Sequence, residues 1–139
     1  MELSSVKAKV LIIDDDADIR NAIRLTLESE MKSSFTFAEA DTVASGLGAL
    51  KSTEPDVVIL DLHMPGENGF DFIDKVKQSK LFSEAKVIIL TAHGSLKNLL
   101  KAQNKGIGAY HFMSKPFQSD ELLALVLSIV LPKPGIAPS

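Results

Sequence analysis

An uninterrupted apolar segment that ends in a carboxylate constrains this chain more than any other feature. Residues 57–60 read Val-Val-Ile-Leu, and Asp61 follows them directly. Aliphatic residues without polar alternation are typical of a strand buried on both faces, as in a parallel sheet covered by helices. The Pro and Gly residues within 62–69 then predict a loop. Because ligands bind at the carboxyl ends of strands in open α/β sheets, we expect Asp61 to lie at a functional site.

Apolar strands and amphipathic helices alternate along the rest of the chain. The predicted strands are residues 9–13, 35–38, 57–60, 86–90 and 109–113. The predicted helices are residues 17–31, with Asp16 as N-cap, then 40–50, a short helix near 70–76, one opened by Gly94-Ser95, and 120–131. Crossovers of this kind are right-handed, so we predict a doubly wound α/β domain. Its five-stranded parallel sheet has the flavodoxin-like order 2-1-3-4-5 and helices on both faces.

Length and composition limit the possible classes of protein. The 139 residues suit one domain, which we place at 1–131, and residues 132–139 predict a Pro-rich linker or C-terminal tail. A net charge of −3 without a Lys/Arg cluster argues against direct nucleic-acid binding. No apolar run approaches the roughly 18 residues of a membrane span, and the first residues do not resemble a secretion signal. Together with the absence of cysteine, this predicts a cytoplasmic protein.

Polar residues stand at the ends of four predicted strands. Asp14 and Asp15 follow 9–13, Thr91 follows 86–90, and Lys115 follows 109–113. The topology brings them to one crevice with Asp61. Neighbouring carboxylates repel at neutral pH unless they hold a proton or a cation, and oxygen ligands without a His or Cys cluster favour Mg²⁺.

This arrangement suits a phosphoryl group. A metal ion, the Lys115 ammonium and the Thr91 hydroxyl can each stabilise charge on phosphoryl oxygens. Asp61 would then be the nucleophile and form an aspartyl phosphate.

The residues resemble one known family, the receiver domains of two-component response regulators. The resemblance extends from Lys9 to about Val130. The motifs that carry it are Asp14-Asp15, Asp61 with His63-Met64-Pro65-Gly66, Asn68-Gly69, Thr91-Ala92 and Lys115-Pro116-Phe117.

The resemblance implies a role for each site residue. Asp61 accepts a phosphoryl group from a histidine kinase or phosphotransfer protein, and Lys115 pairs with the phosphoryl oxygens. Mg²⁺ is held by Asp15, Asp61 and the backbone carbonyl of His63, with Asp14 acting mainly through water. Thr91 and Phe112 form the switch, in which the Thr91 hydroxyl moves to the phosphoryl group and the Phe112 ring rotates inward. Such a domain signals and is not an enzyme, although it assists its own phosphorylation and dephosphorylation.

Two departures from the family pattern affect the surface through which such domains pass on their signal. The segment from Thr91 to Lys115 is slightly longer than usual, with the extra residues placed at 105–108, and Phe112 stands where many members have Tyr. Family receivers associate through the face formed by their last two helices and the strand between them, which predicts a homodimer, or docking of an effector domain beyond this chain. In the last helix, Leu122, Leu123, Val126, Ile129 and Val130 form a core-facing stripe. We expect the remaining leucines, Leu125, Leu127 and Leu131, to be exposed there.

Other interpretations are weaker. Asp14, Asp16 and Asp18 mimic a calcium loop, but Ile19 replaces its Gly and Leu25 its Glu. A phosphatase of the haloacid-dehalogenase type needs a second Asp where this chain has His63. A flavodoxin-like mononucleotide binder needs a Gly/Ser/Thr-rich loop where the acidic residues 14–16 would repel phosphate. His63 and His93 flank the site, either as exposed loop residues or as modulators of dephosphorylation, and His111 is expected to be structural or exposed.

Overall fold

A five-stranded parallel sheet forms the centre of the molecule. The computed structural model describes residues 7–32, 34–80, 82–83, 86–108 and 111–131. The sheet has the order β2-β1-β3-β6-β7, which is the predicted order 2-1-3-4-5 counted over its own strands. The strands are β2 (Phe35–Ala40), β1 (Ala8–Ile13), β3 (Val57–Leu60), β6 (Val87–Thr91) and β7 (Phe112–Ser114).

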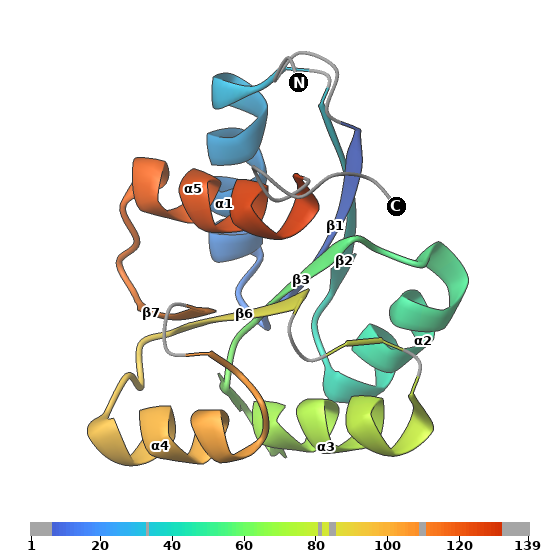
Figure 1. Ribbon diagram of the computed structural model, residues 1–139, viewed down its shortest axis with the longest axis vertical. Helices are drawn as coiled ribbons and strands as arrows, with labels where there is room; N and C mark the ends of the chain where they lie inside the picture. The colour runs from blue at the N-terminus through green and yellow to red at the C-terminus, as the bar shows by residue number, and fades with distance from the viewer. Residues whose placement is uncertain (1–6, 33, 81, 84–85, 109–110, 132–139) are drawn as a thin grey trace, which may run out of the picture.

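Helices cover both faces of this sheet, as predicted. One face carries α1 (Ala17–Glu30) and α5 (Ser119–Val130), and the other carries α2 (Val43–Thr53), α3 (Gly69–Ser79) and α4 (Leu96–Asn104), as Figure 1 shows. Within the described residues, no helix is long and apolar enough to span a membrane.

Strand side chains alternate between two cores. In β1, Val10 and Ile12 pack with α1 and α5, whereas Leu11 and Ile13 pack with the helices of the other face. All four are fully buried. Successive side chains of a strand point to opposite faces, so a strand covered on both sides must be apolar at every position. This explains the uninterrupted apolar runs of the sequence.

Local hydrogen bonds set the starts of the helices. The Asp16 side chain accepts the Asp18 N–H at 2.9 Å and caps α1, as predicted. The prediction for α2 was wrong at both ends, since the helix covers Val43–Thr53 rather than 40–50. Thr42 and Ser45 form a reciprocal capping box there, and Glu54 ends the helix with a positive φ of 49°.

The loop after β3 contains a small hairpin that the sequence pattern did not predict. Strands β4 (His63–Met64) and β5 (Glu67–Asn68) pair antiparallel, with Gly66 at φ 72° in the turn. Two-residue strands are too short to show a periodicity. Gly69 then begins α3, so this helix is longer than the predicted 70–76.

Gly69 is required where the hairpin returns to the end of β3. A Cβ at Gly69 would lie 2.5 Å from the Asp61 carbonyl oxygen and 2.8 Å from the Leu62 Cα. Both are backbone atoms and cannot rotate away. We expect Gly69→Ala to destabilise the protein by about 2 kcal/mol or more, because an added methyl group in a tightly packed place forces the backbone to shift. Urea unfolding measures the change.

Gly48 provides the control for this prediction. It lies inside α2, and a Cβ there would have no atom within 4 Å. Gly48→Ala should therefore stabilise the protein by roughly 0.5–1 kcal/mol, because alanine is the better helix former. Equal stabilities of Gly69→Ala and the parent would contradict our account of this contact.

The last strand lies further along the chain than predicted. β7 covers Phe112–Ser114 rather than 109–113, and Ala109 and Tyr110 lie outside the described residues. Ser114 extends the strand because it is the register partner of Thr91. Before it, α4 ends at Asn104, and the Ile107 side chain, 1% exposed, fixes the turn to the core. His111 is half-buried, and within the described structure its Nδ1 has no hydrogen-bond partner.

The expectation that Leu125, Leu127 and Leu131 are exposed was wrong. All three are partly buried and pack against the core on the α1 side of the sheet. Because α5 contacts both α1 and the sheet, a wider part of its surface is covered than a single stripe implies. On the face formed by α4, β7 and α5, the exposed apolar side chains lie instead on α4, where Leu96 is 69% and Leu100 52% exposed.

Candidate functional site at the carboxyl edge of the sheet

Two adjacent strands deliver the acidic residues to one place. β1 and β3 pair in register through Ile13 and Leu60, and the residues that follow them are Asp14 and Asp61. The Asp61 N–H donates to the Ile13 carbonyl at 2.9 Å, which extends the ladder to the carboxylate itself. β1 lies between β2 and β3, where the order of the strands reverses. This is the position at which doubly wound sheets form their binding crevice.

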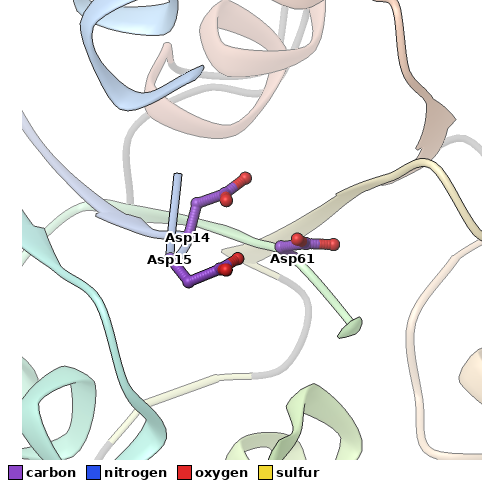
Figure 2. A group of neighbouring side chains, drawn as sticks. All are labelled: Asp14, Asp15 and Asp61. Carbon is purple, nitrogen blue, oxygen red and sulfur yellow. The ribbon is translucent and has the colours of Figure 1, made fainter. Parts of the chain in front are cut away.

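Asp14, Asp15 and Asp61 form an acidic cluster. One carboxylate oxygen from each lies within 4.8 Å of the other two, and Figure 2 shows the three carboxylates side by side. Asp14 and Asp61 are 2% and 5% exposed, whereas Asp15 is exposed at the rim. A set of carboxylate oxygens at this spacing suits a hard divalent cation such as Mg²⁺.

Lys115 joins this cluster from the far end of the sequence. Its Nζ lies 2.7 Å from Oδ2 of Asp14 and 3.3 Å from Oδ2 of Asp61. Lys115 follows β7, which is separated from β3 by β6, so its side chain reaches across the end of β6 to the carboxylates that follow β1 and β3. The closer partner is Asp14, so the lysine is held by one carboxylate beside another.

Burial and the charge of the partner act in opposite directions on the pKa of Asp14 and on that of Lys115. Burial raises the pKa of the Asp14 carboxyl above its ordinary value, and hydrogen bonds from Lys115 and the Asp16 N–H only partly offset this. For Lys115, burial acts to lower the pKa of the ammonium group, but the hydrogen bond to Asp14 and the charges of Asp14 and Asp61 together raise it. The site therefore favours a protonated Lys115, and burial disfavours the ionised form of Asp14.

The two predicted switch residues lie on adjacent strands. Thr91 ends β6 and is fully buried, and its Oγ1 accepts the His93 N–H at 3.1 Å. Phe112 is partly buried in β7 and packs against the core beneath α3 and α4. The Thr91 hydroxyl thus has a local partner in this state.

His63 and His93 lie in direct contact, which the sequence pattern did not predict. Their ring centroids are 4.3 Å apart and the ring planes are inclined by 46°. Each histidine stands two positions after a strand-end site residue, Asp61 or Thr91, on neighbouring strands. That equal offset is the sequence signal that could have revealed the contact.

Glu67 is a further residue that sequence reasoning missed. Its Oε2 accepts the Val43 N–H at 2.7 Å, at the first turn of α2. A carboxylate at a helix N-terminus is favourable, so this bond attaches the loop after β3 to a second helix.

Fold and site together define a doubly wound α/β domain with an acidic cluster and a lysine at its switch point. A family model described as the response regulator receiver domain matches residues 10–127, and the chain belongs to this family. It is a receiver domain of the kind found in two-component signal transduction. The family match favours this class over the phosphatase and mononucleotide-binding alternatives.

Individual relatives agree with this assignment. The chain is 33% identical over 131 residues to the cell cycle response regulator CtrA of Brucella ovis and of Brucella abortus, covering 94% of this chain and 53% of each relative. The chain thus spans about half the length of these curated relatives. A solved receiver domain from Clostridium thermocellum is 30% identical with a TM-score of 0.75, covering 88% of this chain and 94% of that one. A CheY-like receiver domain from Methanospirillum hungatei is 26% identical with a TM-score of 0.74, covering 89% and 93%.

Proposed function

We propose that this domain takes a phosphoryl group from a histidine kinase or phosphotransfer protein onto Asp61. The observation that carries the proposal is the acidic cluster beside the Lys115 ammonium group at the ends of β1 and β3. In the transfer, a bond forms between an Asp61 carboxylate oxygen and phosphorus. The phosphorus–nitrogen bond of the donor phosphohistidine breaks, and the imidazole takes its electron pair.

The groups around Asp61 would each stabilise part of the negative charge on the phosphoryl oxygens. Mg²⁺ fits the acidic cluster, with Asp15, Asp61 and the His63 carbonyl as ligands and Asp14 acting through water. When bound it supplies positive charge to the phosphoryl oxygens. Lys115, held by Asp14 at 2.7 Å, is placed to pair with one of these oxygens. We propose no other catalytic activity for the domain than assistance to its own phosphorylation and dephosphorylation.

Phosphorylation would act on the rest of the domain through Thr91 and Phe112. The Thr91 hydroxyl exchanges its contact with the His93 N–H for a bond to the phosphoryl group, and the Phe112 ring turns into the space that Thr91 leaves. This shifts the equilibrium between two conformations of the face formed by α4, β7 and α5. We place the receiver domain at 1–131, in the cytoplasm, where it meets the kinase, and we propose that an effector domain follows it in a longer protein.

The test of this function is phosphorylation by a small donor. The purified protein is incubated with acetyl phosphate with and without Mg²⁺, and its intact mass is measured. We expect one phosphoryl group per chain, only when Mg²⁺ is present. A protein that gains none under conditions that label a known receiver domain is not a phosphoacceptor.

The two N-terminal acids should differ in their contribution to Mg²⁺ binding. Both oxygens of Asp14 have partners, since Oδ2 lies 2.7 Å from Lys115 Nζ and Oδ1 accepts the Asp16 N–H at 2.9 Å. Asp15 is exposed and can reach an ion directly. We expect Asp15→Asn to weaken Mg²⁺ binding roughly tenfold or more, and Asp14→Asn by a smaller factor. Calorimetric titration measures both, and equal losses contradict the assignment.

We also propose that the α4–β7–α5 face forms a homodimer or docks an effector. Leu96 and Leu100, one turn apart on α4, give this face exposed apolar surface, flanked by the exposed Lys97 and Lys101. We expect beryllofluoride, a mimic of the phosphoryl group, to increase association measured by light scattering, and Leu96→Glu to prevent the increase. Leu25→Glu is the matched control, since Leu25 is 54% exposed on α1. A parent that stays monomeric in both states would remove the dimer.

A further inference from the structure

His63 and His93 form a pair of imidazoles beside the acidic cluster but distinct from it. Both side chains are exposed, and their ring centroids are 4.3 Å apart. They come from different segments, His63 from the hairpin after β3 and His93 from the loop after β6. Neither ring has a role in the proposed phosphoryl transfer, since the part assigned to His63 belongs to its backbone carbonyl.

The backbone of each histidine is held in place. The His63 N–H donates to Oδ1 of Asp61 at 3.3 Å, and His63 is the register partner of Asn68 in the hairpin. The His93 N–H donates to Thr91 Oγ1 at 3.1 Å, and the His93 carbonyl accepts from Asn98 Nδ2 at 2.7 Å. The contact between the rings therefore joins two anchored segments, so the pair is largely preorganised.

The rings line a pocket of about 350 Å³ that also contains oxygen donors. Glu67 and Asn98 contribute a carboxylate and an amide to its wall. Lys101, the cation of the pocket wall, lies with its Nζ 4.6 Å from the centre of the Phe70 ring, which gives its charge a local partner. Among the described residues, a group of three or more ligating side chains occurs only at Asp14, Asp15 and Asp61. The histidine pair would thus provide two protein ligands, with water in the other positions.

The spacing of the two rings is close to that of two ligands on one metal ion. Zn²⁺ binds imidazole nitrogen at about 2.0–2.1 Å, and two such ligands on a tetrahedral ion place the ring centres roughly 5 Å apart. The observed 4.3 Å is shorter, so the two rings would have to move apart, which a rotation of either side chain about its Cα–Cβ bond allows. Imidazole nitrogen prefers Zn²⁺ and its neighbours in the first transition row, whereas carboxylate oxygen suits Mg²⁺.

We propose that His63 and His93 bind a Zn²⁺ ion that links the loops after β3 and β6, next to the Mg²⁺ position. The site belongs to the unphosphorylated domain, in which the backbone bonds of His63 to Asp61 and of His93 to Thr91 are present. Two ion classes thus occupy neighbouring places in the crevice, one selected by carboxylates and the other by imidazoles.

The test is a titration of the full chain with zinc chloride in excess Mg²⁺, followed by calorimetry and by NMR of the imidazole rings. We expect the ring signals of His63 and His93 to shift together, and those of His111 to stay unchanged. His93→Gln and His63→Gln should each weaken zinc binding at least tenfold. His111→Gln, the matched control on the third histidine, should leave it unchanged.

Three outcomes would overturn the proposal. The first is ring signals of His63 and His93 that do not move at saturating zinc in the parent, a measurement that needs no variant. The second is unchanged zinc affinity in a His93→Gln protein that keeps its circular dichroism spectrum and its Mg²⁺ affinity. The third is loss of the zinc site in Asp15→Asn, because the ion would then occupy the acidic cluster.

Discussion

Asp61→Asn is expected to abolish phosphorylation of this domain by acetyl phosphate. The Asp61 side chain is 6% exposed and lies at the end of β3, with one oxygen near Lys115 Nζ and the other near the His63 N–H. These two donors orient a carboxylate toward the crevice. The amide of asparagine keeps the shape but removes the negative charge and the nucleophilic oxygen. Intact mass after incubation with Mg²⁺ and acetyl phosphate measures the result.

Asp56→Asn is the matched control for this loss. Asp56 stands at the opposite end of the same strand, where its Oδ2 accepts the Lys9 N–H at 2.8 Å. The control variant should gain a phosphoryl group as the parent does. Phosphorylation of Asp61→Asn at the parental rate would show that another residue is the acceptor, and peptide mapping would locate it.

Lys115→Met is expected to destabilise the metal-free protein by about 3 kcal/mol, the lower end of the range for breaking a buried ion pair. The side chains of Asp14 and Asp61 are only 3% and 6% exposed, and Lys115, 15% exposed, is the cation that contacts both. Methionine fills similar space without the charge, so two carboxylates remain in a poorly solvated place. Thermal unfolding should show a decrease of roughly 10 °C in the midpoint, and Mg²⁺ should restore part of it.

The pH dependence of this effect follows from the two pKa shifts. The raised pKa of Lys115 means that its stabilising contribution is fully present below the ordinary lysine pKa and is lost only as pH rises through the higher folded value. The raised pKa of Asp14 means that its ionised form carries a cost in the folded state, and this cost disappears as the group is protonated in acid. The difference between Lys115→Met and the parent should therefore be largest near neutral pH and shrink toward acid pH.

Lys105→Met is the control for this prediction. Lys105 pairs with Asp74 at 2.5 Å, but the two side chains are 22% and 42% exposed. Exposed pairs contribute about 0–1 kcal/mol, so this variant should unfold close to the parent. A Lys115→Met protein as stable as Lys105→Met, with no recovery on adding Mg²⁺, would contradict the account of the buried pair.

The strands and helices of this domain could be predicted from the sequence because burial requires a recognisable apolar pattern in each strand. A strand covered on both faces has to be apolar throughout, so the apolar runs at 10–13 and 57–60 identified their strands without any knowledge of their neighbours. The order of the sheet followed from right-handed crossovers. The residues after each strand predicted Asp14, Asp61, Thr91 and Lys115 as neighbours, and the structure shows contacts of Lys115 with Asp14 and Asp61. Helix limits were less accurate where a side-chain cap decided them, as at Thr42.

The tertiary structure decided what depends on distances between segments remote in sequence. Leu125 and Leu127 are partly buried because α5 packs against both α1 and the sheet. The apolar pattern of a helix predicts which side faces the core, but it does not predict how much of the helix surface its neighbours cover. The preference of Lys115 for Asp14, 101 positions away, depends on the lateral spacing of the strands. The contact between His63 and His93 depends on how two loops return over the sheet, and loop conformation has no periodicity from which to predict it. The sequence by itself therefore determined which polar residues stand at the carboxyl ends of the strands, and the tertiary structure decided which of them touch.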